Sequence, residues 1–400
     1  MHFGDDPHRR EKSLLCVITA FFWFAQYVYM PFLTPYLFAL SMTATTVGLI
    51  IGAYGVTQLV LRIPLGVTVD IVHNHKLFIL VGTFFAGVSS LGMMIFQSPA
   101  LLFASNALSG VASSTWISFT VLYPSYYEKS EGAKAISVLS QFQKVGNLTA
   151  YLIGALLFGY VGIRGLFLAS FAAGVIGAVL TLFMRREPAA PAVNLTMGGL
   201  VGVAKNRRLL FSSTMTTLMN LLVFGTVLSF TTSTAKNLGA TGMQLGIFAL
   251  LYSAAGIPGA RFAGTRFASG AGEKTLLPLC FALIGIYCIG IASSRTVTPF
   301  FFLQIVAGFS NGLLASMLMT NAVKEIGADR KSTAMGFYQS IYSIGMTGGP
   351  MFMGFLVDHS STRASFVIMA LIAFACAAAI PPVYRSNLLI AAKPTTGAAR

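Results

Sequence analysis

The chain alternates between long apolar runs and short polar breaks along nearly its whole length. A helix needs about 20 apolar residues to cross a hydrocarbon core of about 30 Å, and each run is long enough for one crossing. Two of the breaks are short, at Gln97–Pro99 and Tyr160–Arg164, but without them one helix would be far too long. The pattern predicts twelve membrane-spanning helices, near residues 13–38, 45–69, 77–96, 100–123, 135–159, 165–184, 209–234, 242–263, 275–292, 299–323, 332–355 and 364–384.

The composition argues against a soluble protein. Apolar residues make up 56% of the chain and charged residues 9%, whereas about 25% of an average soluble protein is charged. So few charges would not solvate the surface of a globule of 400 residues, so lipid must cover most of it. The polar start, Met1 to Lys12, leads into an apolar stretch too long for the core of a cleavable signal, and we interpret that stretch as an uncleaved first span.

The basic residues orient the predicted spans. The net charge of +15 lies in short segments between spans, without the basic and aromatic strip that would indicate nucleic-acid binding. With the N-terminus inside, 19 of the 26 Lys and Arg residues fall in cytoplasmic segments, 4 in outer loops and 3 within spans. Cytoplasmic loops are normally the ones rich in Lys and Arg. We therefore expect a multi-pass protein of the cytoplasmic membrane of a bacterium, with both termini in the cytoplasm.

The longest polar stretch, between Arg185 and Arg208, divides the chain in half. We interpret residues 1–190 as one six-helix bundle, 191–208 as a cytoplasmic linker, and 209–400 as a second bundle with a short cytoplasmic tail. No segment suits a soluble enzymatic or regulatory domain. The four cysteines have no paired spacing and lie inside apolar segments, which predicts neither disulfides nor a metal site: Cys16, Cys280, Cys288 and Cys376.

The two halves also match each other in sequence. At an offset of 198 residues several side chains recur, and an amide stands opposite an amide where Asn106 meets Gln304. The recurring pairs include Gly48 with Gly246, Tyr54 with Tyr252, Lys76 with Lys274, and Gly110 with Gly308. Parallel repeats of this kind are typical of secondary transporters, whose solute site lies near the membrane midplane between the halves. The fold class we predict is an all-α membrane protein of two pseudo-symmetric six-helix bundles.

The loop after the second span carries a further signal. It reads Gly66-Val-Thr-Val-Asp70-Ile-Val-His-Asn-His-Lys76, and with the twelve spans and the repeat it resembles the major facilitator superfamily over essentially the whole chain. The first Gly, the Asp and a terminal base of that family's signature are present, while Ile71, His73 and Asn74 depart from it. The resemblance implies that Asp70 holds a cytoplasmic gate closed near Ser332. The alternative is that Asp70 only marks the end of the second span.

Lys144 is the deepest charge in the predicted spans. It lies about nine residues into span five, roughly 14 Å from the cytoplasmic end, whereas all eleven acidic residues map to loops, tails or span ends. A Lys at this depth would bind an anionic solute group or change its charge during transport, with Gln141 one helical turn away. The alternative is a side chain that extends to the lipid headgroups. The shallower Arg62 and Arg261 lie near helix ends, where structural duty is expected.

The resemblance also implies that spans one, four, seven and ten line the central cavity. The polar and aromatic residues these spans place near their middles are Trp23, Gln26, Tyr27, Asn106, Asn220, Gln304 and Asn311. They would hold a polar or amphipathic solute, or else join helix to helix by hydrogen bonds. Gating would involve the signature loop, Arg62 and the Gly-Pro motif of span eleven, that is Gly66, Asp70, Lys76, Arg62, Gly345 and Pro350.

Two departures bear on coupling to protons. Proton-linked members of the family often carry Arg where Asn106 stands, and drug–proton exchangers often carry a Gly-Pro motif in span five, where this chain has no proline. We predict a secondary transporter, without cofactor or metal and acting as a monomer, that exports amphipathic compounds by alternating access. Uptake or exchange of a small organic anion is the alternative, with a coupling ion left open. A membrane sensor or an embedded enzyme is disfavoured, because no signalling domain or catalytic constellation is present.

Overall fold

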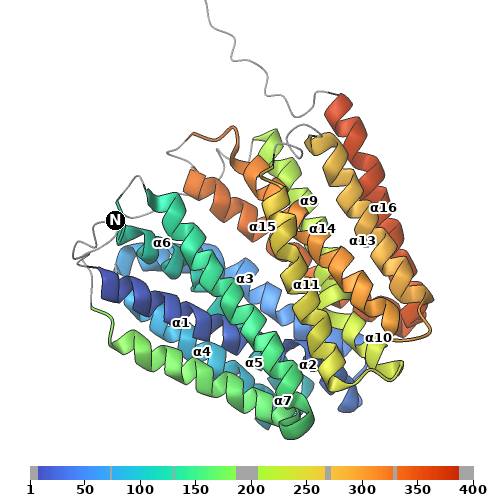
Figure 1. Cartoon of the computed structure of the whole chain (residues 1–400), viewed down its shortest axis with the longest axis horizontal. Helices are drawn as coiled ribbons and strands as arrows, with labels where there is room; N and C mark the ends of the chain where they lie inside the picture. Colours follow the sequence, from blue (N-terminus) through green and yellow to red (C-terminus); the bar gives the residue numbers. More distant parts are fainter. Residues whose placement is uncertain are drawn as a thin grey trace, which may run out of the picture.

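The protein is all-helical over the residues that the structure, a computed structural model, describes: 8–72, 74–128, 131–185, 206–265, 272–327 and 331–386. Figure 1 shows the helices in chain order. They are α1 (Arg9–Tyr27), α2 (Met30–Ala39), α3 (Ala44–Val72), α4 (His75–Ile95), α5 (Pro99–Ser114), α6 (Trp116–Ser125), α7 (Gly132–Leu182), α9 (Arg207–Gly225), the π-helix η2 (Thr226–Phe230), α10 (Thr231–Asn237), α11 (Gly242–Phe262), α13 (Glu273–Ser293), α14 (Thr298–Val323), α15 (Lys331–His359) and α16 (Thr362–Arg385).

Both short breaks predicted from the sequence are present. Helix α4 ends at Ile95 and α5 begins at Pro99. Helix α7 is a continuous assignment of 51 residues, but Gly162 inside it has φ 62° and ψ −171°, a backbone geometry that is non-helical and favours glycine. The chain therefore folds back at Gly162, and α7 supplies the fifth and sixth spans.

Nine helical stretches of the described residues are long and apolar enough to cross a membrane. One of them, Lys134–Leu182, contains the reversal at Gly162. Helix α15 and the α5–α6 pair, which the chain divides at Thr115, account for the remaining two of the twelve predicted spans. The chain is thus a multi-pass membrane protein.

Spans one and seven are not the uninterrupted helices that their hydropathy predicts. Span one divides into α1 and α2 at Val28 and Tyr29, just before Pro31. Span seven widens into η2, where the Ser229 hydroxyl donates a hydrogen bond to the Phe224 carbonyl oxygen. The two irregular segments are 198 residues apart, so the same place in both bundles departs from α-helical geometry.

The helix bounds and the packing both follow the internal repeat. Helix α4 covers 75–95 and α13 covers 273–293, the same interval displaced by 198 residues. A Cβ atom at Gly110 would clash with the carbonyl oxygen of Tyr54, and one at Gly308 would clash with that of Tyr252. The recurring Gly and Tyr residues are therefore partners in one helix contact that each bundle builds once. The predicted linker, 191–208, lies mostly outside the described residues and stays a prediction.

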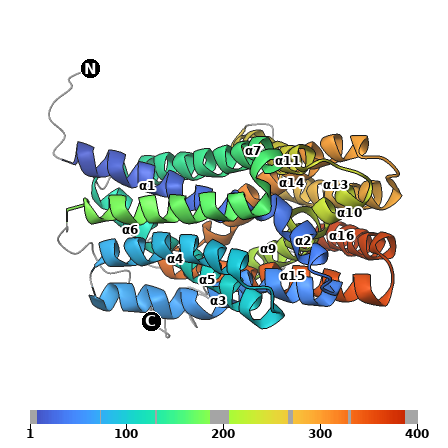
Figure 2. The same ribbon diagram turned by 90° about the horizontal axis from the view of Figure 1, so that it is seen from below.

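The two bundles lie side by side (Figure 2) and their helices converge where α2 and α10 meet (Figure 1). Helix α3 packs on α15, and α7 packs on α11. At these contacts Gly48 lies against the Pro350 carbonyl and Gly246 against Ala155. Small residues let helix backbones approach closely in membranes, which explains the glycines at both places.

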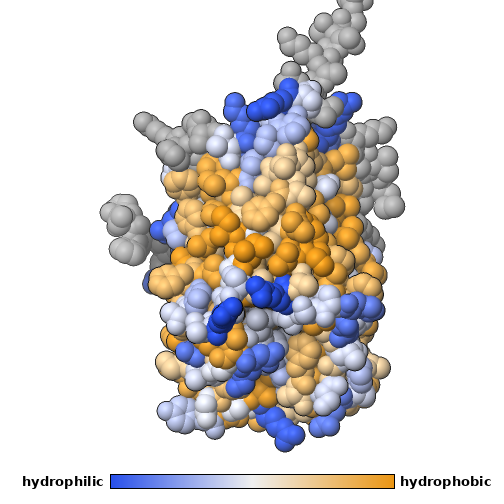
Figure 3. All heavy atoms as spheres, turned by 90° about the vertical axis from the view of Figure 1, so that its right-hand side faces the viewer, coloured by the Kyte–Doolittle hydropathy of each residue, from blue (hydrophilic) through white to orange (hydrophobic). Residues whose placement is uncertain are grey.

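The surface has the layering of a membrane protein. A hydrophobic band separates hydrophilic residues on the side that α13 and α16 occupy (Figure 3). Its outward side chains include Ile286 and Leu371, which are 52% and 61% exposed and would be costly in water. We call the end that carries Lys76 and Arg208 the basic end, and the opposite one the Asp358 end. The four cysteines are buried and unpaired.

Candidate solute site between the two bundles

A small cavity lies between the bundles near the middle of the spans. Its volume for a water-sized molecule is about 30 Å³, enough for one or two waters. Residues of α1, α2, α3 and α5 line it from one side and Phe224 of α9 from the other: Gln26, Tyr27, Tyr29, Met30, Leu33, Ile51, Tyr54, Asn106, Ser109 and Phe224. The lining is aromatic and amide-bearing, and both bundles contribute to it.

Gln26 is held in this cavity by a hydrogen-bond chain. Its Nε2 donates to the Ser109 carbonyl at 3.1 Å and to the Ser113 hydroxyl at 3.2 Å, while its Oε1 accepts from the Ser109 hydroxyl. The Ser113 hydroxyl donates in turn to the Tyr54 hydroxyl at 2.9 Å. A buried amide with several partners is fixed in orientation, so Gln26 presents a defined polar edge.

Asn106 has a structural task as well as a place in the cavity lining. Its Nδ2 donates to the carbonyl oxygens of Ile50 at 2.7 Å and Ile51 at 3.1 Å, which ties α5 to α3. Both amide hydrogens are thus used. The oxygen of the same side chain is the group left to face the cavity.

A second, smaller cavity of about 10 Å³ lies beside the first. It is lined by Pro31, Tyr151, Val227, Leu228, Thr232, Ala249, Tyr252 and Gln304. The Tyr151 ring also meets the Tyr27 ring edge-on, with 5.7 Å between centroids, which links the two cavities. Gln304 is 1% exposed, and its Oε1 has no hydrogen-bond partner among the described residues. A buried acceptor without a partner costs about 1–3 kcal/mol, so this oxygen is suited to receive a donor from a ligand.

The remaining predicted residues of the spans surround these cavities without lining them. Trp23 is buried on α1, with its ring 5.2 Å from Trp116 and 5.7 Å from Tyr27. Asn220 on α9 is buried, and Asn311 on α14 is half-buried with an unpartnered Oδ1. Aromatic stacking behind Tyr27 makes the Trp23 position a support for the cavity wall.

Lys144 lies on the face of α7 that turns toward α11. Tyr151 and Ala155 follow it by seven and eleven residues, so the three side chains share one helix face. Ala155 is packed against Gly246, and Tyr151 lines the second cavity. Lys144 itself is exposed although protein atoms surround it densely, as is Gln141 one turn further on. Helices α7 and α11 are therefore in contact at Ala155, while Lys144 on the same face is exposed.

Arg62 is buried and joins the two bundles. Its Nη1 donates to the Tyr342 hydroxyl of α15 at 3.3 Å, and its guanidinium lies 5.8 Å from that ring. The acidic side chains that the structure describes all lie at helix ends: Glu11, Glu128, Glu131, Glu273, Glu325 and Asp358. The described charges within the spans are therefore positive.

Asp358 makes a bundle-to-bundle contact that the sequence did not predict. Its Oδ1 accepts from the Ala44 backbone N–H at 2.9 Å and its Oδ2 from that of Thr45 at 2.7 Å, so it caps the start of α3 from the end of α15. Desolvation acts to raise the pKa of this carboxyl, but the bonds from Thr45 and Ala44 outweigh it and lower the pKa.

The predicted gate residues have different surroundings. Gly66 and Asp70 fall in the last turns of α3, and the placement of Asp70's side chain lies outside what the structure describes. Lys76 donates to the carbonyl oxygens of Leu182 at 2.8 Å and Met184 at 2.5 Å, a contact within the N-terminal bundle. A Cβ at Gly345 would clash with the Thr217 carbonyl, so this glycine lets α15 approach α9. Pro350 lies within α15 against Gly48.

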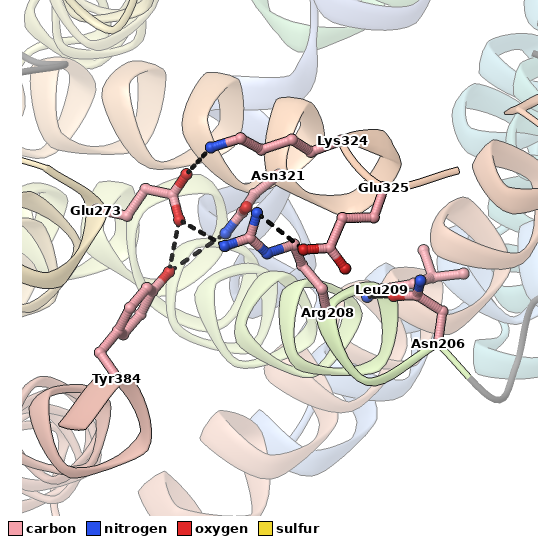
Figure 4. A network of polar contacts seen from close by, with 8 residues as sticks. All are labelled: Asn206, Arg208, Leu209, Glu273, Asn321, Lys324, Glu325 and Tyr384. Carbon is pink, nitrogen blue, oxygen red and sulfur yellow. Dashed lines mark hydrogen bonds and ion pairs between the residues drawn. The ribbon is translucent and has the colours of Figure 1, made fainter. Parts of the chain in front are cut away.

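A network of polar contacts links the helix ends of the C-terminal bundle at the basic end (Figure 4). Arg208 of α9 lies 3.4 Å from Glu325 and 3.9 Å from Glu273, which also pairs with Lys324 at 3.5 Å. The Tyr384 hydroxyl of α16 donates to Glu273 at 3.0 Å. These contacts join the ends of four helices of the C-terminal bundle and involve no residue of the other bundle. They therefore hold those four helices together at this end.

Two repeat-related helical bundles with a polar cavity between them define the class of secondary transporters. The chain belongs to the Major Facilitator Superfamily, whose sequence profile it matches over residues 15–292 and again over 214–396. It is therefore a transporter and not an enzyme.

Known proteins similar to this chain are transporters too. An uncharacterised MFS-type transporter of Methanocaldococcus jannaschii is 26% identical over 344 residues, which cover 82% of this chain and 86% of that one. The bacterial homologue of the human lysosomal transporter Spinster, in an inward-facing and unoccupied conformation, has a TM-score of 0.78 at 16% identity, covering 98% of this chain and 100% of that chain. The nucleoside transporter NupG has a TM-score of 0.76 at 15% identity, covering 94% of this chain and 99% of that one. At these identities the two solved structures establish the fold alone.

Proposed function

We propose that the protein exports amphipathic solutes, as a monomer of the cytoplasmic membrane, and binds them between Gln26 and Tyr27 on one side and Tyr252 and Gln304 on the other. The observation that carries this proposal is the lining of the two central cavities, which combines aromatic rings with three amide side chains, among them Gln304 with its unpaired oxygen, and contains no carboxylate. Aromatic faces suit the apolar part of such a solute, and the amides suit its polar groups.

We further propose that the basic end is cytoplasmic and that this conformation is open toward it. The bundles are held together at the Asp358 end by the Asp358 cap and by the glycine contacts at Gly48 and Gly246. Toward the basic end, the exposure of Lys144 on the face shared with Tyr151 supports a separation of α7 from α11. Opening of the opposite end requires that the Asp358 contacts break.

Reconstituted vesicles test the export proposal. We expect wild-type protein to carry amphipathic dyes, and Gln304→Leu to lower kcat/KM about tenfold, because a donor on the solute loses a buried acceptor. Gln339→Leu on α15 is the matched control, since that half-buried amide lines neither cavity. Equal dye transport by both variants would exclude the central cavities, and transport confined to the inward direction would overturn export.

A small organic anion is the second candidate, and the position of Lys144 favours it. A cation at the opening toward the central site would attract an anionic group and hold it on its way. We expect Lys144→Gln to lower organic-anion transport about tenfold, because one charge-assisted contact is lost. Lys134→Gln on the same helix is the control, since Lys134 pairs with Glu131 at the helix end. Unchanged anion transport by Lys144→Gln would refute this candidate. A comparison with and without a pH gradient decides whether protons are coupled.

A further inference from the structure

A third, larger cavity lies at the Asp358 end of the C-terminal bundle, away from the central site. It has a volume of about 300 Å³, opens to the surface, and is bordered by the end of α10, the end of α13 and the start of α16. Its lining residues are Thr234, Asn237, Leu238, Ile291, Ala292, Ser293, Ser294, Arg295, Thr362, Arg363 and Phe366. Three helices of one bundle therefore build it, and no residue of the N-terminal bundle contributes.

Two arginines give this cavity an uncompensated positive charge. Arg295 and Arg363 are exposed, and neither forms an ion pair within the part of the chain that the structure describes. Lys236 lies next to the lining residue Asn237. Asp358 is the one described acid at this end, and both of its oxygens are bonded to the start of α3. A positive cavity with no carboxylate of its own is suited to an anion.

The other lining groups match a phosphate rather than a bare carboxylate. Two guanidinium groups from different helices present a wide array of N–H donors, which fits the several oxygens of a phosphate. The Thr362 hydroxyl lies in the same lining, together with Ser293 and Ser294, whose hydroxyls donate to carbonyl oxygens of α13. The floor is apolar, with Ile291 and Phe366 almost fully buried. A ligand with a phosphate and an apolar part would satisfy both surfaces.

The cavity opens beside lipid-facing surface. Helices α13 and α16, which form two of its walls, carry exposed apolar side chains along their length, including Ile286, Ile289 and Leu371. Figure 3 views this side of the molecule and shows hydrophilic residues directly bordering the hydrophobic band. A headgroup in the cavity would therefore leave its acyl chains along the outward faces of α13 and α16.

We propose that this cavity binds the phosphate headgroup of an anionic phospholipid, with Arg295 and Arg363 as its two cationic contacts. The lipid would connect α10, α13 and α16 at their ends. Because α10 packs against α2 of the other bundle, occupancy also steadies the closed Asp358 end. The site shares no lining residue with the central cavities, so the proposal does not depend on which solute is carried.

Native mass spectrometry of the full-length protein in lipid mixtures tests this proposal. The probes are phosphatidylglycerol and phosphatidylcholine with the same acyl chains. We expect wild type to retain one phosphatidylglycerol preferentially, and Arg295→Gln and Arg363→Gln each to weaken that binding about tenfold. Arg164→Gln removes another exposed arginine that lies outside the cavity, so it serves as the matched control. Melting temperatures in phosphatidylcholine alone show that each variant is folded.

Two results would overturn the proposal. One is the same phosphatidylglycerol affinity in wild type, Arg295→Gln and Arg363→Gln. The other is stabilisation of wild type by inorganic phosphate in phosphatidylcholine, lost in both arginine variants, with no added effect of phosphatidylglycerol. That second result would assign the cavity to a free anion. The Arg363→Lys variant, which keeps the charge but not the planar group, should lose less affinity than Arg363→Gln.

Discussion

Removal of the Asp358 carboxylate should shift the protein toward opening at the Asp358 end. In the closed arrangement this carboxylate accepts two backbone N–H groups, from Ala44 at 2.9 Å and Thr45 at 2.7 Å. When the bundles part at this end, the two N–H groups and the carboxylate return to water. The Asp358→Ala variant therefore loses an interaction that exists in one conformation only, and its effect falls on the conformational equilibrium.

The size of the shift follows from the geometry and the exposure. A side chain that caps the first N–H groups of a helix contributes about 0.5–2 kcal/mol, typically about 1. Asp358 is exposed, so water competes for its oxygens and a value near the middle of that range applies. A change of about 1 kcal/mol corresponds to about a fivefold increase in the population open at the Asp358 end. Asp358→Asn, which keeps one acceptor oxygen, should have a smaller effect.

Alkylation of a cysteine in the central cavity measures that population even when it is small. Met30 lines the first cavity, so a Met30→Cys variant should react with a membrane-impermeant maleimide added on the Asp358 side at a rate proportional to the open fraction. We expect Asp358→Ala to raise this rate about fivefold. The four native cysteines are buried, and protein without Met30→Cys gives the background.

Ser361→Ala is the matched control for this experiment. Ser361 caps α16 by accepting from the Ala364 N–H at 3.1 Å, at the same end of the molecule but within one bundle. Its loss should lower the melting temperature without a change in the alkylation rate. Equal alkylation rates for wild type and Asp358→Ala, with both proteins folded, would refute the reasoning.

Three further predictions follow from single contacts. Because hydrogen bonds lower the pKa of Asp358, the closure they support is complete above the ordinary carboxyl pKa of about 4 and is lost as pH falls below it. The alkylation rate of Met30→Cys in the Asp358→Ala background, divided by the rate without that change so that the thiol's own pH dependence cancels, should stay at about fivefold from pH 5 to 8 and fall toward one at lower pH. Gly308→Ala should lower stability by about 1–3 kcal/mol in thermal melts, since a Cβ clashes with Tyr252, while Gly348→Ala, with no atom within 4 Å, should not. Lys76→Met should lower melting with no change in alkylation rate, because Lys76 caps the end of α7; an altered rate at unchanged stability would instead support the gate.

The sequence predicts the fold well because hydropathy and repetition both report on the scaffold. The reversal at Gly162 was predicted from length alone, since one apolar helix of that extent would exceed the membrane. The recurring Gly110 and Gly308 were visible as a repeat, and each turns out to touch the recurring Tyr of its own bundle. By contrast, the division of span one at Val28 and the π-helix in span seven leave hydropathy unchanged, so no apolar pattern reveals them.

The site was predicted less completely, for a physical reason. Gln26, Tyr27, Asn106 and Gln304 line the central cavities. The sequence singles them out because polar groups in apolar spans are conspicuous, and their part in solute binding stays a prediction. Tyr151 lines the second cavity too, but it lies in span five, which the family resemblance does not place along the cavity. The partners that occupy the Asn106 amide, two backbone carbonyls of another helix, exist only in the folded protein.

The starts of α3 and α11 are equivalent in the repeat but are capped differently. Asp358 of α15 binds the start of α3. Helix α11 caps itself, because Thr241 accepts from the Gln244 N–H while the Gln244 side chain accepts from the Thr241 N–H. At the equivalent place in α3, Thr43 likewise accepts from the Thr46 N–H, at 3.2 Å. Thr46 stands opposite Gln244, and its short side chain bonds the Thr43 hydroxyl and not the Thr43 N–H.

Helix α3 therefore has half of a capping box of its own, and Asp358 of the other bundle adds acceptors for the N–H groups of Ala44 and Thr45. A Thr46→Gln substitution should complete a capping box in α3 and contribute about 0.5–2 kcal/mol to its stability. In the Asp358→Ala background it should restore the melting temperature but leave the raised alkylation of Met30→Cys in place, since the new cap does not join the bundles. If Thr46→Gln returned the alkylation rate to the wild-type value, Asp358 would act as a helix cap alone and not as a bond between the bundles.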